Sequence, residues 1–145
     1  MLAIGCDHGG FELKQTIMAY FDGVGIEYKD FGCYTTDSVD YPDIAEPVCN
    51  SVISGECEKG ILVCGTGIGM SIAANKIKGI RAALLSDTFS AQMTAEHNNS
   101  NVIALGGRVI SDELAIDIIK AYLAAEFQGG RHIARLEKIR LLEEK

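Results

Sequence analysis

The sequence predicts an α/β domain in which a parallel sheet lies between two layers of helices. Short apolar runs alternate with longer amphipathic segments five times along the chain, a pattern typical of such sheets. The apolar runs are continuous rather than alternating, as expected of strands that are buried on both sides. The length of 145 residues fits one domain, 1–145, which can bury a core without disulfides or metal.

Five apolar runs are the expected strands. They are residues 2–6, 26–31, 60–64, 81–85 and 102–105. The run at 60–64, GILVC, is the clearest, because it is wholly apolar and bounded by glycines. The run at 26–31 is the weakest, since Glu27, Lys29 and Asp30 alternate with its apolar residues.

Six segments whose apolar residues recur with helical spacing are the expected helices. They are residues 11–21, 43–53, 69–77, 89–97, 111–127 and 132–142. In the fifth, Ser111 suits the N-cap, and Asp112 and Glu113 suit the positive end of the helix. The sequence therefore predicts a Rossmann-like three-layer sandwich with a five-stranded parallel sheet and a C-terminal helix.

Charge and cysteine content exclude several classes of protein. A net charge of −7 and a pI of about 4.9 argue against nucleic-acid binding, which needs a basic surface. No apolar run approaches the roughly 20 residues that span a bilayer, so we expect no membrane partner. Five cysteines without C-x-x-C spacing argue against a disulfide scaffold or a zinc site. Free thiols favour a reducing, cytoplasmic setting.

The stretch from Cys64 to Gly69, CGTGIG, is the strongest candidate for chemistry. Ligands of parallel α/β sheets bind beyond the carboxyl ends of the strands, and here a strand ends at a cysteine before a glycine-rich turn. Backbone N–H groups of such a turn can lower a thiol pKa and stabilise a nearby oxyanion. The alternative is a structural thiol at a strand end.

The same glycines also resemble a dinucleotide-binding fingerprint. Gly65, Gly67 and Gly69 approach the G-x-G-x-x-G pattern, and Asp87 lies near the expected distance downstream. However, the third glycine comes one residue early, and the motif follows the third strand rather than the first. A nucleotide-binding Rossmann-like module therefore remains an alternative function.

Histidines and arginines form the second group of candidates. Asp7 and His8 follow the first strand directly, whereas His97 precedes a polar run of asparagines that is either a solvated loop or the rim of a sugar site. Arg131 and Arg135 share one face of the last helix, four residues apart. Arginine suits phosphate because its donors form a planar fork. The alternative is salt bridging with glutamates of that helix.

Six stretches together resemble the ribose-5-phosphate isomerase B family, which includes the galactose-6-phosphate and allose-6-phosphate isomerases. In order they read GCDHGGFELK, DYPDIA, GILVCGTGIGMSIAANK, GIRAAL, HNNSNVIALGGRVI and GGRHIARLEKI. The resemblance covers essentially the full chain. It implies an aldose–ketose isomerase, an intramolecular oxidoreductase that interconverts D-ribose 5-phosphate and D-ribulose 5-phosphate through an enediolate.

The resemblance also implies roles for individual residues. Cys64 is the expected base, Thr66 assists it, and His97 opens the furanose ring. Cys64 together with Met70, where some relatives have glutamate, indicates the subgroup that uses cysteine. The expected substrate-binding residues are Asp7, His8, Tyr41, Gly65, Gly67, Gly69, Met70, Asn98, Arg108, Arg131 and Arg135.

We expect no cofactor and no metal, because fixed dipoles and hydroxyls can polarise the carbonyl. The resemblance further implies a homodimer, or a dimer of dimers, whose active sites are shared between subunits. Two alternatives remain besides the nucleotide-binding module. One is an isomerase of a six-carbon sugar phosphate, allose or galactose 6-phosphate. The other is a non-catalytic subunit of a hetero-oligomer, against which the presence of both Cys64 and His97 counts.

Overall fold

The computed structural model describes residues 1–145 and contains one five-stranded sheet in which all paired strands are parallel. The strands are β1 Leu2–Cys6, β2 Tyr28–Asp30, β3 Lys59–Cys64, β4 Ala82–Leu84 and β5 Val102–Gly106. Their order across the sheet is β2-β1-β3-β5-β4. The central strands β1, β3 and β5 are almost wholly buried, which explains why their sequences are continuous apolar runs.

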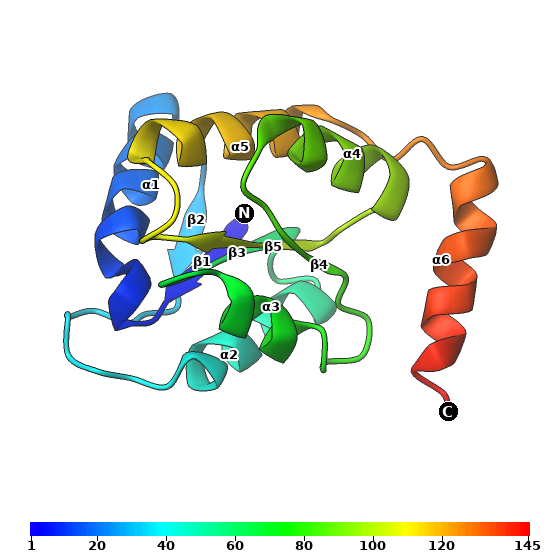
Figure 1. The fold of residues 1–145 in the computed structure, drawn as a ribbon, viewed down its shortest axis with the longest axis horizontal. Coiled ribbons are helices and arrows are strands. Elements are labelled where there is room, and N and C mark those ends of the chain that lie inside the picture. The colour runs from blue at the N-terminus through cyan, green and yellow to red at the C-terminus, as the bar shows by residue number, and fades with distance from the viewer.

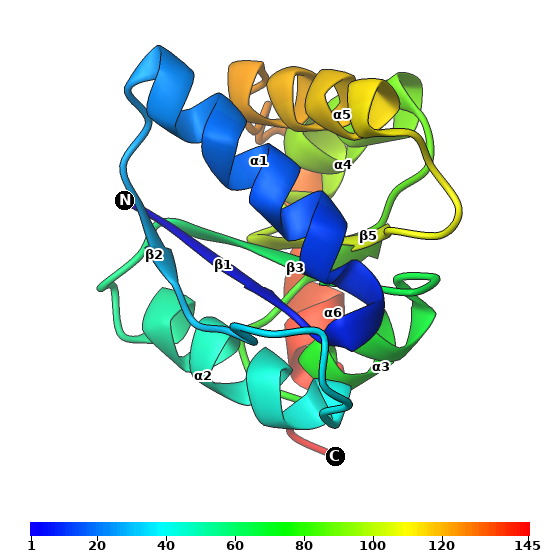
Figure 2. The ribbon, with the colours of Figure 1, turned by 90° about the vertical axis from the view of Figure 1, so that its left-hand side faces the viewer.

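Helices cover both faces of the sheet, so the fold has three layers (Figure 1). The helices are α1 Phe11–Val24, α2 Tyr41–Ile53, α3 Ile68–Ala74, α4 Thr88–Asn98, α5 Asp112–Ala124 and α6 Arg131–Leu142, with a 3-10 turn, η1, at His8–Gly10. The layer of α1, α4 and α5 lies on one face, and α2 and α3 lie on the other (Figure 2). Helix α6 stands apart beside the β4 edge. The predicted three-layer α/β fold is confirmed.

Each face of the sheet has its own apolar core, and successive residues of β3 alternate between the two. Ile61 and Val63 belong to the core beneath α1 and α5, whereas Leu62 and Cys64 belong to the core beneath α2 and α3. A fully buried leucine or isoleucine side chain contributes about 1.5–3 kcal/mol. Because β3 is packed on both sides, the position of Cys64 at its end is well defined.

The expected elements are all present, and differences occur at their ends. The weak strand expected at 26–31 is the three-residue strand β2. It lies at the edge of the sheet, so β1 is its one neighbouring strand. The helix expected at 69–77 ends at Ala74. There the Asn75 amide accepts from Ala82 N at 2.9 Å and donates to Ala82 O at 3.0 Å, which directs the chain into β4. The helix expected to reach residue 127 ends at Ala124. No helix is long and apolar enough to cross a membrane.

The strand order creates a crevice at the carboxyl edge of the sheet. After β1 the chain moves outward to β2, and after β3 it moves to the other side, toward β4 and β5. Ligands of open α/β sheets bind where the connections diverge in this way. The loops after β1 and β3 touch here: a Cβ on Gly9 would lie 3.0 Å from the backbone nitrogen of Gly65. The two loops with the most reactive residues therefore meet at the part of the sheet edge where a ligand is expected.

Candidate active site

The Cys64 thiol lies at the carboxyl end of β3 and accepts a hydrogen bond from its own loop. The N–H of Gly67 donates to Cys64 Sγ at 3.2 Å. Gly67 has a left-handed φ of 80°, and a Cβ there would lie 2.6 Å from Leu84 Cδ1, so only glycine fits this turn. A backbone donor aimed at the sulfur stabilises negative charge on it. The side chain is buried, at 4% exposure.

Besides Gly67, two positions after β3 were expected in the site: Thr66, whose side chain is open to solvent, and Gly69, which is covered by the ring of Tyr41. Thr66 is exposed, and its hydroxyl accepts from Ile68 N at 3.2 Å. The ring of Tyr41, from the first turn of α2, lies against Gly69, where a Cβ would be 2.7 Å from Tyr41 Cζ. The Met70 side chain is fully buried in the core, so the role expected of Met70 in substrate binding falls to its backbone N–H.

Arg108 reaches the same loop from β5, the neighbour of β3. Its backbone N–H donates to Gly65 O at 2.9 Å, and a Cβ on Gly65 would lie 3.2 Å from Arg108 Nη1. Gly65 and Arg108 are 43 residues apart in sequence, and the pairing of Cys64 with Gly106 brings them together. A guanidinium therefore lies directly beside the thiol-bearing loop.

A cavity of about 240 Å³ opens next to Arg108 and is predominantly polar. It is lined by His8, Gly9, Glu12, Leu13, Thr36, Gly107 and Arg108. The N–H of Val39 donates to His8 Nδ1 at 3.2 Å, so the ring carries its proton on Nε2 when neutral and can donate it. Asp7 is nearly buried and accepts from Gly9 N at 2.9 Å, which holds the η1 turn. The imidazole and the guanidinium can bind an anion, and the exposed Glu12 carboxylate lines the same cavity.

The remaining candidates gather on α4 and α6. His97, on the last turn of α4, stacks on His132 of α6 with ring centroids 4.3 Å apart. Burial lowers the pKa of His132, and His97, Arg131 and Arg135 lower it further by charge repulsion.

Arg131 and Arg135 do not form the salt bridges with glutamates of α6 that were the alternative to phosphate binding. Arg140 pairs with Glu137 at 2.7 Å and with Glu144 at 3.5 Å, whereas Arg131 and Arg135 have no ion-pair partner in the chain. Both are exposed. Their charges are therefore available to a ligand or to another chain. Asn98 is also exposed and lines a cavity between α4, β4 and α6 of about 290 Å³.

These two groups of residues lie at opposite ends of the sheet. Cys64 pairs with Gly106 at the carboxyl end of β5, whereas His97 precedes Val102 at the amino end. The four residue steps from Gly60 to Cys64 alone span about 13 Å of strand. One chain therefore does not bring His97 to the thiol of its own Cys64.

Two residues near the candidate site, Thr36 and His132, were not predicted from the sequence. Thr36 lies in the cavity but belongs to a long loop whose path depends on Val39 and His8. His132 was visible beside the two arginines, yet its stacking on His97 depends on the irregular segment 125–130. No group of three histidine, cysteine, aspartate or glutamate side chains in the structure is arranged to hold a metal ion.

The fold brings a thiol, an imidazole and a guanidinium to the carboxyl edge of an α/β sheet, the place where ligands of such sheets bind. The chain belongs to the ribose/galactose isomerase family, whose model matches residues 2–139, so it is an enzyme of the sugar isomerase class. This confirms the resemblance seen in the sequence.

Relatives agree over nearly the full length of the chain. Ribose-5-phosphate isomerase B of Escherichia coli K12 is 47% identical over 144 residues, which are 99% of this chain and 97% of the relative. Among solved structures, Clostridium thermocellum ribose-5-phosphate isomerase B is 50% identical with a TM-score of 0.97, covering 99% of this chain and 97% of that one. The Mycoplasma genitalium enzyme with bound ribulose 5-phosphate is 38% identical with a TM-score of 0.94, covering 99% and 96%.

Proposed function

We propose that this enzyme interconverts D-ribose 5-phosphate and D-ribulose 5-phosphate through an enediolate. The observation that carries the proposal is the Cys64 thiol, which accepts the Gly67 N–H at 3.2 Å beside a cavity that contains His8 and Arg108. Relatives of this length that carry the ribose-5-phosphate isomerase name, one of them with ribulose 5-phosphate bound, support the same substrate.

Cys64 acts as the base. Its thiolate removes the proton from C2 of the open-chain aldose, and the resulting thiol returns a proton to C1 of the enediolate. The hydroxyl proton passes from O2 to O1 in the same conversion, which leaves the carbonyl at C2 of the ketose. Negative charge develops on the substrate oxygens during this transfer, and fixed donors aimed at it lower the barrier. These donors are the Thr66 hydroxyl and those backbone N–H groups from Gly65 to Met70 that are not already bound to Cys64 Sγ or Thr66 Oγ1.

The phosphate is held by side chains from two copies of the chain. His8 and Arg108 contact it from the Cys64 end of one subunit, and Arg131 and Arg135 contact it from the α6 helix of another. Tyr41 lines the sugar pocket beside Gly69. Two arginines without ion-pair partners support this assignment, because an exposed guanidinium keeps its full fork of donors for phosphate.

His97 opens the furanose ring in a site that two subunits share, with Asn98 beside it and Asp7 assisting from the other subunit. An imidazole can both accept and donate a proton near neutral pH. The distance between His97 and Cys64 within one chain supports a homodimer or a dimer of dimers. So does a set of exposed apolar side chains on α3, β4 and α4, around the Cys64 loop. This set is Ile68, Ile72, Leu84 and Phe89.

Mixing two inactive variants tests the shared site directly. Cys64→Ala and His97→Asn each remove one essential group. In a mixed dimer, one site combines the intact Cys64 of one subunit with the intact His97 of the other. If half of the dimers are mixed and one of their two sites works, about a quarter of the wild-type activity should return. A site built within one chain would stay inactive in every mixture.

The substrate is tested by turnover of ribose 5-phosphate without added cofactor, with allose 6-phosphate and galactose 6-phosphate compared at equal concentrations. The family description names galactose as well as ribose, so a six-carbon sugar phosphate is the second candidate. A higher kcat/KM for either six-carbon substrate would reassign the function within the same chemistry.

A further inference from the structure

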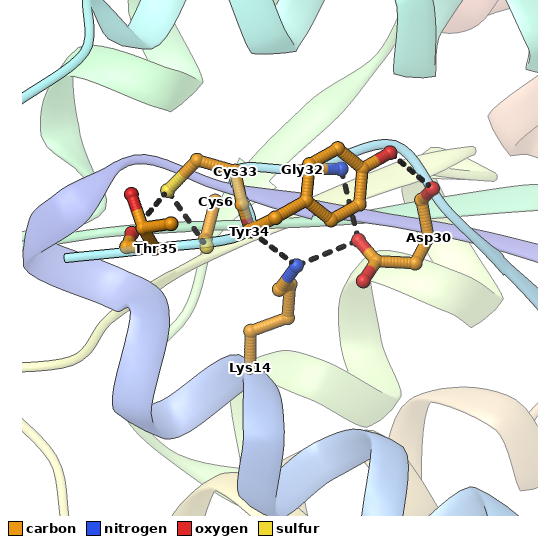
Figure 3. A network of polar contacts seen from close by, with 7 residues as sticks. All are labelled: Cys6, Lys14, Asp30, Gly32, Cys33, Tyr34 and Thr35. Atoms are coloured by element: carbon orange, nitrogen blue, oxygen red, sulfur yellow. Dashed lines mark hydrogen bonds and ion pairs between the residues drawn. The ribbon is translucent and has the colours of Figure 1, made fainter. Parts of the chain in front are cut away.

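Two cysteines outside the catalytic loop form a close pair of thiols. Cys6 ends β1, and Cys33 lies three residues after β2, with their Sγ atoms 3.8 Å apart (Figure 3). Two backbone hydrogen bonds hold the segments side by side: Cys6 N donates to Gly32 O at 2.6 Å, and Cys33 N donates to Cys6 O at 2.7 Å. We propose that Cys6 and Cys33 are a modification site that hydroperoxides oxidise to a reversible disulfide.

The backbone geometry suits this bond. The two backbone hydrogen bonds hold Cys6 and Cys33 close together, as a disulfide requires, since such bonds span Cα separations of only about 4.4–6.8 Å. The sulfur atoms need to approach by about 1.8 Å to reach bonding distance. Side-chain rotation supplies part of this movement, since both thiols point to the same face of the sheet and belong to one apolar core. The other free cysteines, Cys49, Cys57 and Cys64, have no sulfur partner in the chain.

The two thiols have different parts in the reaction. Cys33 is 7% exposed and reachable by a small peroxide, whereas Cys6 is fully buried. Burial raises the pKa of Cys6 to about 12, against the opposing charge of Lys14, so Cys6 remains a thiol at neutral pH. The Lys14 ammonium donates to Cys33 O at 2.7 Å and is itself buried. Lys14 also pairs with Asp30 at 2.6 Å, so these contacts hold the segment that carries Cys33 against α1.

The chemistry balances in two steps. Cys33 sulfur attacks hydrogen peroxide, the O–O bond breaks, and the peroxide is reduced to water as the thiol is oxidised by two electrons to a sulfenic acid. Cys6 sulfur then attacks Cys33 sulfur, which forms the disulfide, and the sulfenic hydroxyl leaves with the Cys6 proton as a second water. Two equivalents of a thiol reductant restore both cysteines.

Oxidation would reach the anion cavity through the loop that follows Cys33. In the reduced protein Cys33 Sγ donates to Thr35 O at 3.3 Å, and the disulfide removes this donor. The next residue, Thr36, lines the cavity, and Val39 further on holds His8. We therefore expect the disulfide to weaken phosphate binding several-fold. This consequence rests on the proposed role of the cavity, whereas formation of the disulfide does not.

The bond itself is tested by peptide mapping of the full chain in a Cys64→Ser background, which keeps the catalytic thiol out of the reaction. After hydrogen peroxide, an endoproteinase that cuts before aspartate should yield peptides 1–6 and 30–36 joined, with the loss of two hydrogen atoms. A thiol reductant should separate them. The link should disappear with Cys6→Ser or Cys33→Ser and persist with Cys49→Ser, the matched buried cysteine. Peroxide in denaturant should instead give mixed pairs.

Absence of the linked peptide from folded protein, or pairing of Cys33 with another cysteine, would overturn the proposal. The coupling to the cavity is tested by calorimetry with inorganic phosphate on the reduced and oxidised Cys64→Ser protein. Equal affinities would overturn the coupling and leave the disulfide standing. Failure of the enzyme to isomerise ribose 5-phosphate would not affect the peptide map, so the two proposals fail separately.

Discussion

The two ends of the sheet carry functional groups in very different ways. At the Cys64 end, each group is fixed by backbone hydrogen bonds and by glycines that admit close contact, as between Gly67 and the Cys64 sulfur. At the His97 end, the groups lie on the last turn of α4 and on α6, a helix that makes few contacts with the rest of the chain (Figure 1). The groups at the Cys64 end are preorganised within one chain. The groups at the His97 end need contacts with another chain to be held in place.

The largest expected effect comes from breaking the preorganised end. Cys64→Ala should lower kcat by about a thousandfold or more, because it removes the base rather than a binding contact. Steady-state kinetics measure the loss, and far-UV circular dichroism with a thermal melt verifies that the fold is intact. Alkylation by iodoacetamide should inactivate the wild type, with protection by substrate. A kcat near normal for Cys64→Ala would remove the cysteine from the mechanism.

At the His97 end, a substitution should slow ring opening more than proton transfer between the carbons. His97→Asn should slow turnover of cyclic ribose 5-phosphate by about a hundredfold, since ring opening needs an acid–base group. Exchange of the carbon-bound proton of ribulose 5-phosphate with solvent should suffer much less, because that ketose cannot close into the same ring. NMR in deuterated water follows the exchange. Equal losses in both assays would assign His97 to the enediolate step or to the fold, and no loss would make Asp7 the next candidate.

The arginines of α6 should affect binding more than chemistry. Arg131→Ala and Arg135→Ala should each raise KM for ribose 5-phosphate about tenfold, with a smaller fall in kcat if the phosphate also positions the sugar. Arg108→Ala tests the other side of the phosphate in the same way. Arg140→Ala is the matched control on the same helix, because Arg140 is occupied by Glu137 and Glu144. Normal KM values for all three variants would place the anion site elsewhere.

The same contrast explains how much could be predicted from the sequence. The strands and the loops at their carboxyl ends could be predicted from local pattern, since a short continuous apolar run such as 60–64 is typical of a strand buried on both sides. Because parallel strands end at one edge, the loops after Cys6, Cys64 and Gly106 had to lie near one another. The strand order, which brings Arg108 beside Gly65, depends on long-range packing and left no local signal.

The His97 end was harder to predict because its contacts are made by exposed and irregular segments. The four residues between His97 and Val102 imply that His97 lies at the amino end of β5, away from Cys64. No pattern in the sequence indicates that His132 would stack on it. A buried Lys14 in α1 was equally hidden, because its partners, Asp30 and the Cys33 carbonyl, become neighbours only when β2 pairs with β1.

The smallest expected effect concerns how firmly α6 is held against α4. Burial, His97 and the two arginines of α6 lower the pKa of His132 below its ordinary value of 6.5 in the folded protein. At pH values between this lowered pKa and 6.5, His132 therefore binds more protons when α6 is detached or the chain is unfolded than when the protein is folded. The stabilisation from His132 is thus fully present above pH 6.5 and is lost as the pH falls through this window.

We expect the protection of α6 amides against hydrogen exchange to fall on the order of twofold between about pH 7.5 and about pH 5.5, after correction for the intrinsic rate. Amides of α1, far from any histidine of this group, are the internal reference. His132→Gln should abolish the difference, since glutamine keeps a polar side chain but does not titrate. An equal pH dependence in His132→Gln would mean that another group controls α6. Greater protection at the lower pH would mean that protonated His132 gains a carboxylate partner, and that the α6 end is held by charge rather than by the stack.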